Sequence, residues 1–247
     1  MTNPINIKYR SHRGGVYYTP ENTMPAFEAA LKEGFAYIET DPCCTKDGII
    51  VLHHDGTINR TCRNPDGSVI KDSIPISSLT YEELLEYDAG IAMGDKFKGT
   101  KVPTLEMLLK KAENTDVIIA LDKKIQTHEI QPLLELTAKF NTKVCFSCKD
   151  VERIKRIQEL LPDAMIDYDG NTTEEELRAV TSLVKRENLL VWLYMDKPNF
   201  AWLTDRFKAS KENCMRVKRY ARLGIANICT PYDVKEALEF NPDVIEI

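Results

Sequence analysis

Residues 6–41, NIKYRSHRGGVYYTPENTMPAFEAALKEGFAYIETD, contain the pattern that decides the fold. The run NIKYRS at the start and the run YIETD at the end have the β-branched and aromatic character of strands. Between them we expect an amphipathic helix, because Thr23 is a favoured N-cap residue, Pro25 suits the first turn and Gly34 suits the position after the last turn. A strand, a helix and a strand in this order predict two parallel strands joined by a right-handed crossover.

Similar runs recur along the rest of the chain, several of them separated by further helical patterns. They are IIVLHH (49–54), VIIALD (117–122), KVCFSC (143–148), AMIDY (164–168), LLVWLYM (189–195), ANICT (226–230) and DVIEI (243–247). The alternation of strand and helix predicts one α/β domain over residues 1–247 with the (β/α)₈ TIM-barrel fold. The candidates number nine, one more than a barrel needs, so DVIEI is either the eighth barrel strand or an accessory piece after closure.

A long polar stretch, Asp55 to Lys101, separates the third and fourth predicted strands. It contains NPDG, a short helical pattern around Tyr81 to Tyr87 and three glycines. Because this stretch is too long for an ordinary barrel loop, we expect a small insertion after the third strand, at about 56–100. An excursion of this size on the catalytic face of a barrel usually covers or shapes a substrate cleft.

Composition excludes several classes of protein. The net charge is −5, and 33 basic and 38 acidic residues are mixed along the chain, so there is no basic stripe for nucleic acid. No stretch approaches the roughly 20 apolar residues of a membrane span, and the N-terminus lacks a signal-peptide core, which predicts a cytoplasmic protein; a signal peptide removed beforehand is the open alternative. Seven cysteines, most of them inside apolar runs, argue against a disulfide framework. Oligomeric state is left open.

Polar residues gather where four successive predicted strands end. They are His12 and Arg13, Glu39 and Asp41, His54, and Asp122 and Lys124. In barrels the reacting groups lie at the carboxyl ends of the strands. Glu39 and Asp41 are two residues apart on a strand and therefore point to one face. Because close carboxylates repel unless a cation lies between them, these two and Asp122 predict one divalent cation, Mg²⁺ or Ca²⁺ with Mn²⁺ as a further choice.

The neighbouring basic residues predict an anionic small-molecule substrate. Arg13 can donate two hydrogen bonds to a phosphate, and Lys124 points to the same face as Asp122. His12 and His54 are candidates for proton transfer, because the histidine side chain in general titrates near pH 6.5. One histidine can accept a proton from the nucleophile while the other donates to the leaving alcohol, so the set predicts a metal-dependent phosphodiesterase.

These residues belong to a series of short motifs spread over the first half of the chain. They are HRG (12–14), PENT (20–23), ETD (39–41), TKDG (45–48), HD (54–55), NRT (59–61) and VPTLEMLL (102–109). In type and order the series resembles the glycerophosphodiester phosphodiesterase family, in register from residue 9 to about residue 125.

The resemblance implies a barrel with a small insertion, a divalent cation and a role in lipid metabolism, through hydrolysis of glycerophosphodiesters to an alcohol and glycerol phosphate. Carried over by position, it implies these roles: acid/base pair His12 and His54, metal ligands Glu39 and Asp41, phosphate contacts Arg13 and Lys124, and loop braces Glu21 and Asn22.

This chain departs from the family pattern at three places. Asp122 stands where the family usually has a glutamate, so the third ligand is one methylene shorter and the metal preference is open. Trp192 corresponds to the family's late Trp-Thr-Val-Asn strand and is a candidate contact for the non-phosphate part of the substrate, with core packing as the alternative. The family's closing Thr-Asp-x-Pro is missing, and the leaving alcohol is not identified.

Three other functions fit parts of the pattern. A cyclising phosphodiesterase, or lyase, of the phospholipase type would use the same histidines and metal and release a cyclic phosphate. A barrel that binds phosphodiesters without catalysis would have its metal binding weakened by Asp122. The presence of both histidines and of Glu39 and Asp41 argues against it. An aldolase- or isomerase-like barrel would need a lysine inside a strand or a late glycine-rich phosphate loop, and neither is evident.

Overall fold

The structure is a computed structural model that describes residues 7–197 and 203–247. Its strands are β1 (Lys8–Ser11), β2 (Tyr37–Thr40), β3 (Pro42–Cys44), β4 (Ile50–Leu52), β5 (Ile118–Leu121), β6 (Lys143–Cys148), β7 (Met165–Tyr168), β8 (Leu189–Tyr194), β9 (Arg222–Ala226) and β10 (Val244–Glu246). Its α-helices are α1 (Met24–Glu33), α2 (Tyr81–Leu84), α3 (Leu105–Ala112), α4 (Gln131–Thr137), α5 (Val151–Leu160), α6 (Glu174–Thr181), α7 (Lys211–Tyr220) and α8 (Pro231–Glu239).

Eight strands follow one another in the order of a closed barrel, β1-β10-β9-β8-β7-β6-β5-β2. All the strand pairs described in this sheet are parallel, with helices between successive strands, and this confirms the predicted (β/α)₈ barrel. In the described part of the chain, no helix combines the length and the apolar character that crossing a membrane requires. The chain divides into two compact parts, residues 1–10 with 144–247, and residues 11–143.

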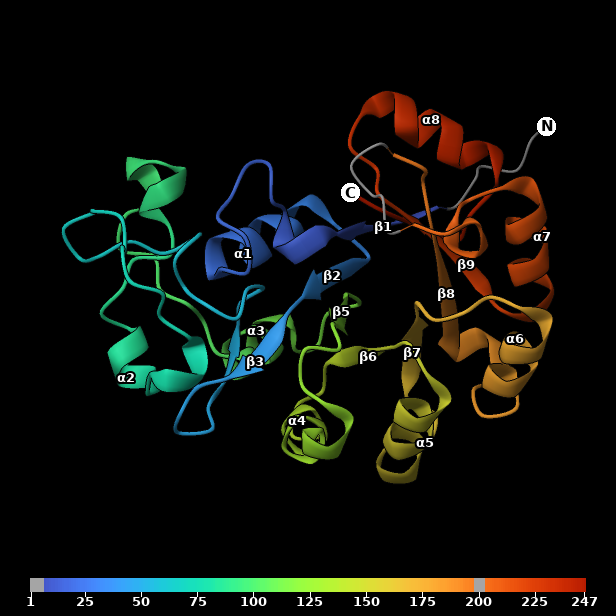
Figure 1. Ribbon diagram of the computed structural model, residues 1–247, viewed down its shortest axis with the longest axis horizontal. Helices are drawn as coiled ribbons and strands as arrows, with labels where there is room; N and C mark the ends of the chain where they lie inside the picture. Colours follow the sequence, from blue (N-terminus) through green and yellow to red (C-terminus); the bar gives the residue numbers. More distant parts are fainter. Residues whose placement is uncertain (1–6, 198–202) are drawn as a thin grey trace. The chain divides into compact units, whose positions relative to one another are not determined.

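The first part contains the late strands. Figure 1 shows helices α5, α6 and α7 following β6, β7 and β8 along the chain. Strand β10 pairs with both β9 and β1, so DVIEI is a barrel strand. The predicted strand ANICT was misplaced, because β9 ends at Ala226. Thr230 instead caps α8 in a capping box with Asp233, a helix start that a short apolar run conceals.

The second part contains β2, β5 and a separate hairpin. The prediction that IIVLHH is a barrel strand was wrong, because β4 pairs antiparallel with β3 in a two-stranded sheet. The physical reason is the turn TKDG between them, where Gly48 has a φ of 79°. A turn this short permits an antiparallel hairpin, whereas parallel strands need a crossover of about a dozen residues or more. The excursion therefore begins directly after β2, and its hairpin carries His54.

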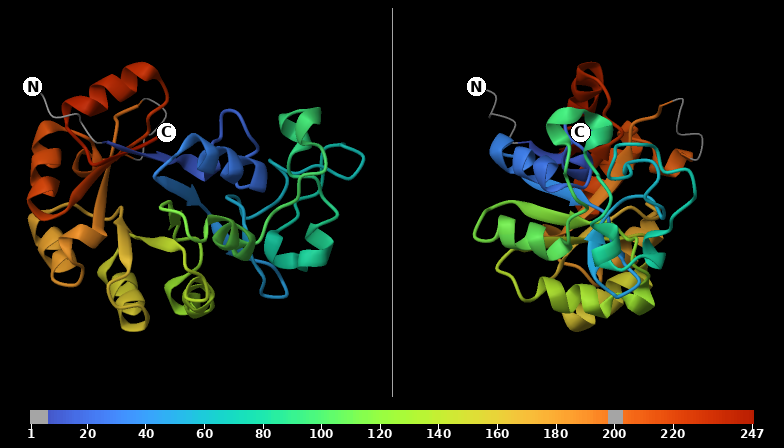
Figure 2. Two further views of the ribbon diagram at one scale, coloured as in Figure 1. Left: turned by 180° about the vertical axis from the view of Figure 1, so that it is seen from behind. Right: turned by 90° about the vertical axis from the view of Figure 1, so that its left-hand side faces the viewer.

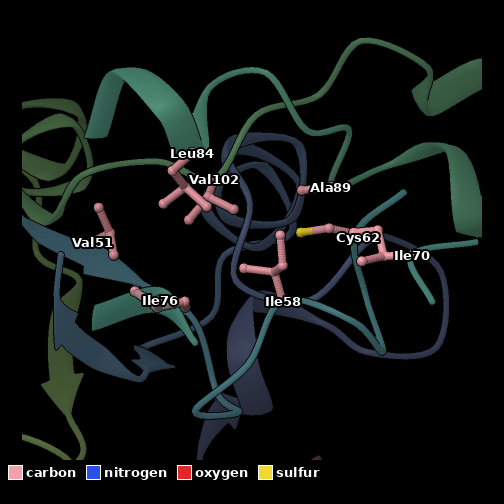
Figure 3. Packing of buried hydrophobic residues seen from close by; sticks show 8 residues of the cluster. All are labelled: Val51, Ile58, Cys62, Ile70, Ile76, Leu84, Ala89 and Val102. Atoms are coloured by element: carbon pink, nitrogen blue, oxygen red, sulfur yellow. The ribbon is translucent and has the colours of Figure 1, made fainter. Parts of the chain in front are cut away.

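The excursion between β2 and α3 has an apolar core of its own. Its buried members are Val51, Ile58, Cys62, Ile70, Ile76, Leu84, Ala89 and Val102 (Figure 3). Figure 2 shows this segment, drawn from cyan to green, looping out beyond β2 and α1. The buried carboxylate of Asp88 accepts hydrogen bonds from the backbone N–H groups of Gly90, Ile91 and Gly99. Packing and these hydrogen bonds therefore give the excursion a defined structure.

Helix α1 confirms the prediction made from its end signals. It begins after Thr23 and ends before Gly34, which takes the left-handed conformation with a φ of 78°. The hydroxyl of Thr23 donates to the carbonyl of Pro20 and does not cap the helix with its side chain. The loop that precedes the helix is thereby closed onto its first turn.

Trp192 on β8 packs against Arg10, the centre of a charged group in the first part. The side chain is 2% exposed, and the guanidinium carbon of Arg10 lies 3.6 Å from the ring centroid. Arg10 also pairs with Asp167 and Glu246, each at 2.5 Å. On β9, a Cβ at Gly224 would lie 2.6 Å from the indole ring. The glycine is required because the ring occupies the space of a side chain.

We therefore expect Gly224→Ala to lower the free energy of unfolding by about 1 to 3 kcal/mol, the usual cost of overpacking. Urea unfolding followed by tryptophan fluorescence measures it. Gly56→Ala is the matched control, because nothing lies within 4 Å of a Cβ built there. Equal stability of the two variants would show that the indole ring moves aside at little cost.

Candidate active site

The loop after β1 turns its backbone toward β2. His12, Arg13 and Gly14 form a short 3₁₀ turn in which Arg13 has a φ of 51° and Gly14 a φ of 80°. A Cβ at Gly14 would lie 2.8 Å from the ring of Phe27, so only glycine allows the loop to lie this close to α1. As a result the backbone N–H of Arg13 donates to Glu39 Oε2 at 2.8 Å.

Three carboxylates meet at the carboxyl ends of β2 and β5. Glu39, Asp41 and Asp122 each offer an oxygen within 4.8 Å of the others. They meet because Thr40 pairs with Leu121, and the N–H of Asp122 donates to the carbonyl of Thr40 at 2.9 Å. Glu39 and Asp41 are buried, with exposed fractions of 6% and 1%. Sequence spacing predicted this cluster.

The geometry of the cluster fits a divalent cation. Asp41 Oδ1 is buried and accepts no hydrogen bond from any described residue. A buried carboxylate oxygen without a donor is costly unless a cation takes that place. All three candidate metal ligands are carboxylate oxygens, and such ligands favour hard ions such as Mg²⁺, Ca²⁺ and Mn²⁺.

Asn22 fixes the orientation of Asp41. Its side-chain amide donates to Asp41 Oδ2 at 2.8 Å, and its carbonyl oxygen accepts from the hydroxyl of Thr40 at 2.7 Å. Its backbone N–H donates to the carbonyl of Arg13 at 2.9 Å. Asn22 is 2% exposed and has a φ of 54°, a conformation that asparagine tolerates better than most residues. The suggested bracing role of Asn22 thus has a structural basis.

Three basic side chains face the carboxylates. Lys124 Nζ lies 3.6 Å from Asp41 Oδ1, and Arg13 Nε lies 3.7 Å from Asp41 Oδ2. His12 Nε2 lies 4.0 Å from Glu39 Oε2, and the side chain is 39% exposed. The predicted residues His12, Arg13 and Lys124 are thus brought together with the carboxylates, in positions that suit an anionic ligand beside a cation.

His54 follows the β3–β4 hairpin, two residues after the end of β4. The backbone N–H of His53 donates to the carbonyl of Asp41 at 2.9 Å, which ties the end of the hairpin to the carboxylate cluster. His54 Nδ1 lies 2.7 Å from Asp55 Oδ1, and the side chain is 32% exposed. His53 is different, because burial lowers its pKa and both ring nitrogens bind within the hairpin segment, to Asp55 and Thr61. His53 is a structural residue.

Arg60 is the site residue that sequence reasoning missed. It donates to Asp55 and to Glu21, and Glu21 also accepts from Arg13 NH1 at 3.0 Å. Hydrogen bonds from Arg60 hold the pKa of Asp55 well below its usual range. The only signal was the NRT motif at 59–61, and nothing in it indicates a partner 39 residues earlier.

Trp192 lies in the other compact part of the chain. Its burial and its stacking against Arg10 are features of core packing. A contact with the substrate stays a prediction for this residue.

Known proteins resemble this chain over most of its length. The model of the family described as "Glycerophosphoryl diester phosphodiesterase family" matches residues 12–229. YhdW of Bacillus subtilis (strain 168) is 31% identical over 191 residues, which cover 72% of this chain and 74% of YhdW. The glycerophosphodiester phosphodiesterase of Caldanaerobacter subterraneus subsp. tengcongensis is 40% identical over 114 residues, 46% of this chain and 44% of that protein.

The fold also matches solved structures. A phosphodiesterase of Oleispira antarctica, solved in complex with the product sn-glycerol-3-phosphate, superimposes with a TM-score of 0.77. The superposition covers 97% of this chain and 92% of the Oleispira antarctica chain, at 17% sequence identity. A similarity at this identity shows the fold alone.

The ion pairs of Glu21 lead to a pH-dependent stability. Burial acts to raise the pKa of Glu21, but the hydrogen bond from Arg60 and the charges of Arg13 and Arg60 outweigh it and lower the pKa below its ordinary 4.5. A lowered pKa in the folded state contributes stability above the unfolded value, and this contribution is lost as pH falls through the folded value.

We expect Glu21→Gln to unfold more easily than the wild type near pH 7, with the difference closing as the pH drops below about 4. Urea unfolding across this range measures the effect. Glu106→Gln, at an exposed position in α3, is the control and should differ little at either pH. A constant gap for Glu21→Gln would contradict the ionic origin of the stabilisation.

Proposed function

The chain belongs to the glycerophosphoryl diester phosphodiesterase family and is thus a phosphoric diester hydrolase, and we propose that it hydrolyses glycerophosphodiesters to glycerol phosphate and an alcohol. We further propose that the reaction depends on a divalent cation, Mg²⁺ or Ca²⁺ with Mn²⁺ as a further choice. The named activities of the relatives and the product bound to the Oleispira antarctica enzyme support the substrate class.

The observation that carries the proposal is the buried carboxylate cluster, in which Asp41 Oδ1 accepts no hydrogen bond from the described residues and lies 3.6 Å from Lys124 Nζ. Glu39, Asp41 and Asp122 are the residues that would hold the cation. A cation there would supply charge neutralisation at the phosphoryl oxygens. Arg13 and Lys124 bind the phosphate from beside the cluster, since both lie within 4 Å of Asp41.

His12 and His54 act as the acid/base pair. His54 Nδ1 lies against Asp55, so the Nδ1–H tautomer leaves Nε2 free to exchange a proton. His12 lies in the turn after β1, and its Nε2 is 4.0 Å from Glu39 Oε2. One ring takes the proton of the attacking water while the other protonates the leaving oxygen, so neither an alkoxide nor a hydroxide has to form in solution.

Activity is tested by incubating the protein with a panel of glycerophosphodiesters, with EDTA and with each added metal. We expect metal-dependent release of glycerol phosphate, and a kcat lower by on the order of 10²-fold or more in His12→Ala and in His54→Ala. His128→Ala is the control, because His128 is exposed and its ion pair within the described chain is with its neighbour Glu129. Running the reaction in ¹⁸O-labelled water distinguishes hydrolysis from cyclisation, since a cyclic product carries no solvent oxygen. Wild-type turnover in both histidine variants would refute the assignment.

Metal binding is tested without substrate. In calorimetric titrations with Mn²⁺ and Ca²⁺ we expect Asp41→Asn and Glu39→Gln to weaken binding about tenfold or more, because each removes an anionic ligand. Asp116→Asn is the control, because Asp116 is an exposed carboxylate two residues before β5 and pairs with Lys143. Unchanged affinity in both cluster variants would place the cation elsewhere.

A further inference from the structure

The guanidinium of Arg60 binds two carboxylates, those of Glu21 and Asp55. Arg60 NH1 and NH2 donate to Glu21 Oε2 and Oε1 at 2.9 and 2.6 Å. Arg60 Nε and NH2 donate to Asp55 Oδ2 and Oδ1 at 2.5 and 3.1 Å. Both carboxylates are thus held in bidentate fashion by one planar fork.

Each of these carboxylates holds a residue of the proposed reaction. Asp55 lies 2.7 Å from His54 Nδ1 through Oδ1, and Glu21 accepts from Arg13 NH1 at 3.0 Å through Oε1. The same two oxygens accept from Arg60. A shift of Arg60 would therefore displace the partners of both residues.

Arg60 is itself held by the apolar core of the excursion. Ile58 and Cys62 on either side of it are fully buried in that core, and the N–H of Cys62 donates to the carbonyl of Ile58 at 2.9 Å. The next arginine, Arg63, is joined to Asp88 by two backbone hydrogen bonds, at 2.8 and 3.0 Å. The base of the Arg60 side chain is therefore fixed although its end is 48% exposed.

We propose that Arg60 is a positioning residue that aligns the His54 ring and the Arg13 guanidinium for the same phosphate. The proposal rests on the proposed function, because it concerns the geometry of that reaction. It assigns to the excursion a part in catalysis, which is to set the relative orientation of an acid/base group and a phosphate-binding group. A planar fork that binds two carboxylates at once can do this, and the ammonium of lysine cannot.

A purely stabilising ion pair would give a different result. Exposed ion pairs contribute little to folding, and losing one would lower stability slightly without a specific effect on turnover. Loss of alignment instead lowers kcat, because misplacement of catalytic groups by about 1 Å costs on the order of 10²-fold in rate. The carboxylate cluster does not contact Arg60 in any described interaction, so binding of the metal should be retained.

The experiment compares Arg60→Ala, Arg60→Lys and the control Arg63→Ala. Among the described residues, the side chain of Arg63 donates only to the carbonyls of Asn59, Arg60 and Cys62. We expect Arg60→Ala to lower kcat on the order of 10²-fold with Mn²⁺ affinity unchanged, and Arg60→Lys to restore only part of the loss. Guanidinium chloride, added below the concentration that unfolds the protein, should raise turnover of Arg60→Ala and leave Arg63→Ala unaffected.

A second readout does not depend on activity. The chain has four histidines, so the ring ¹⁵N signals of His54 can be assigned by comparison with His54→Gln. We expect Arg60→Ala to shift the His54 signals and Arg63→Ala to leave them in place. If the wild type releases no glycerol phosphate but these signals still shift, the proposed substrate fails while the alignment by Arg60 holds. Wild-type kcat and unshifted His54 signals in Arg60→Ala would overturn the inference.

Discussion

Mutual repulsion of the carboxylates at the ends of β2 and β5 is the constraint on which the rest of the site depends. Glu39 and Asp41 are almost fully buried, and Asp122 lies beside them with an oxygen within 4.8 Å of both. Such a group is unfavourable in a protein interior unless positive charge and hydrogen-bond donors surround it. The donors come from Arg13 and Asn22, and Lys124 adds positive charge. None of the described residues donates a hydrogen bond to Asp41 Oδ1. A cation beside this oxygen would therefore stabilise the carboxylates most.

This requirement explains the backbone of the first loop. To direct an N–H at Glu39 and an amide at Asp41, the chain takes positive φ values at Arg13 and at Asn22, outside the conformations most residues favour. The strain is compensated by hydrogen bonds within the loop and by the close packing of Gly14 on α1. Local strain retained beside a charged cluster is typical of functional sites. It accounts physically for the HRG and PENT motifs.

The parts of the site that lie on barrel strands were predictable, and the part on the excursion was not. Two-residue spacing put Glu39 and Asp41 on one face, and parallel strand ends brought Asp122 and Lys124 to them. Periodicity cannot decide whether a short apolar run such as 49–54 pairs with the barrel or folds back on its neighbour. In this chain the four-residue turn TKDG decided it. Arg60 was missed because ion pairs between distant segments leave no periodic trace in a sequence.

His54 and the carboxylates are held by different parts of the fold. His54 follows a hairpin outside the barrel, whereas the carboxylates lie at the ends of barrel strands. The carboxylates lie at the ends of paired strands, whose register leaves little freedom, so the geometry of the carboxylate cluster is set by the barrel. His54 is carried by an excursion with its own apolar core and is linked to the rest of the site through His53, Asp55 and Arg60. Changes in the excursion can therefore move His54 without altering the strand register that brings the carboxylates together.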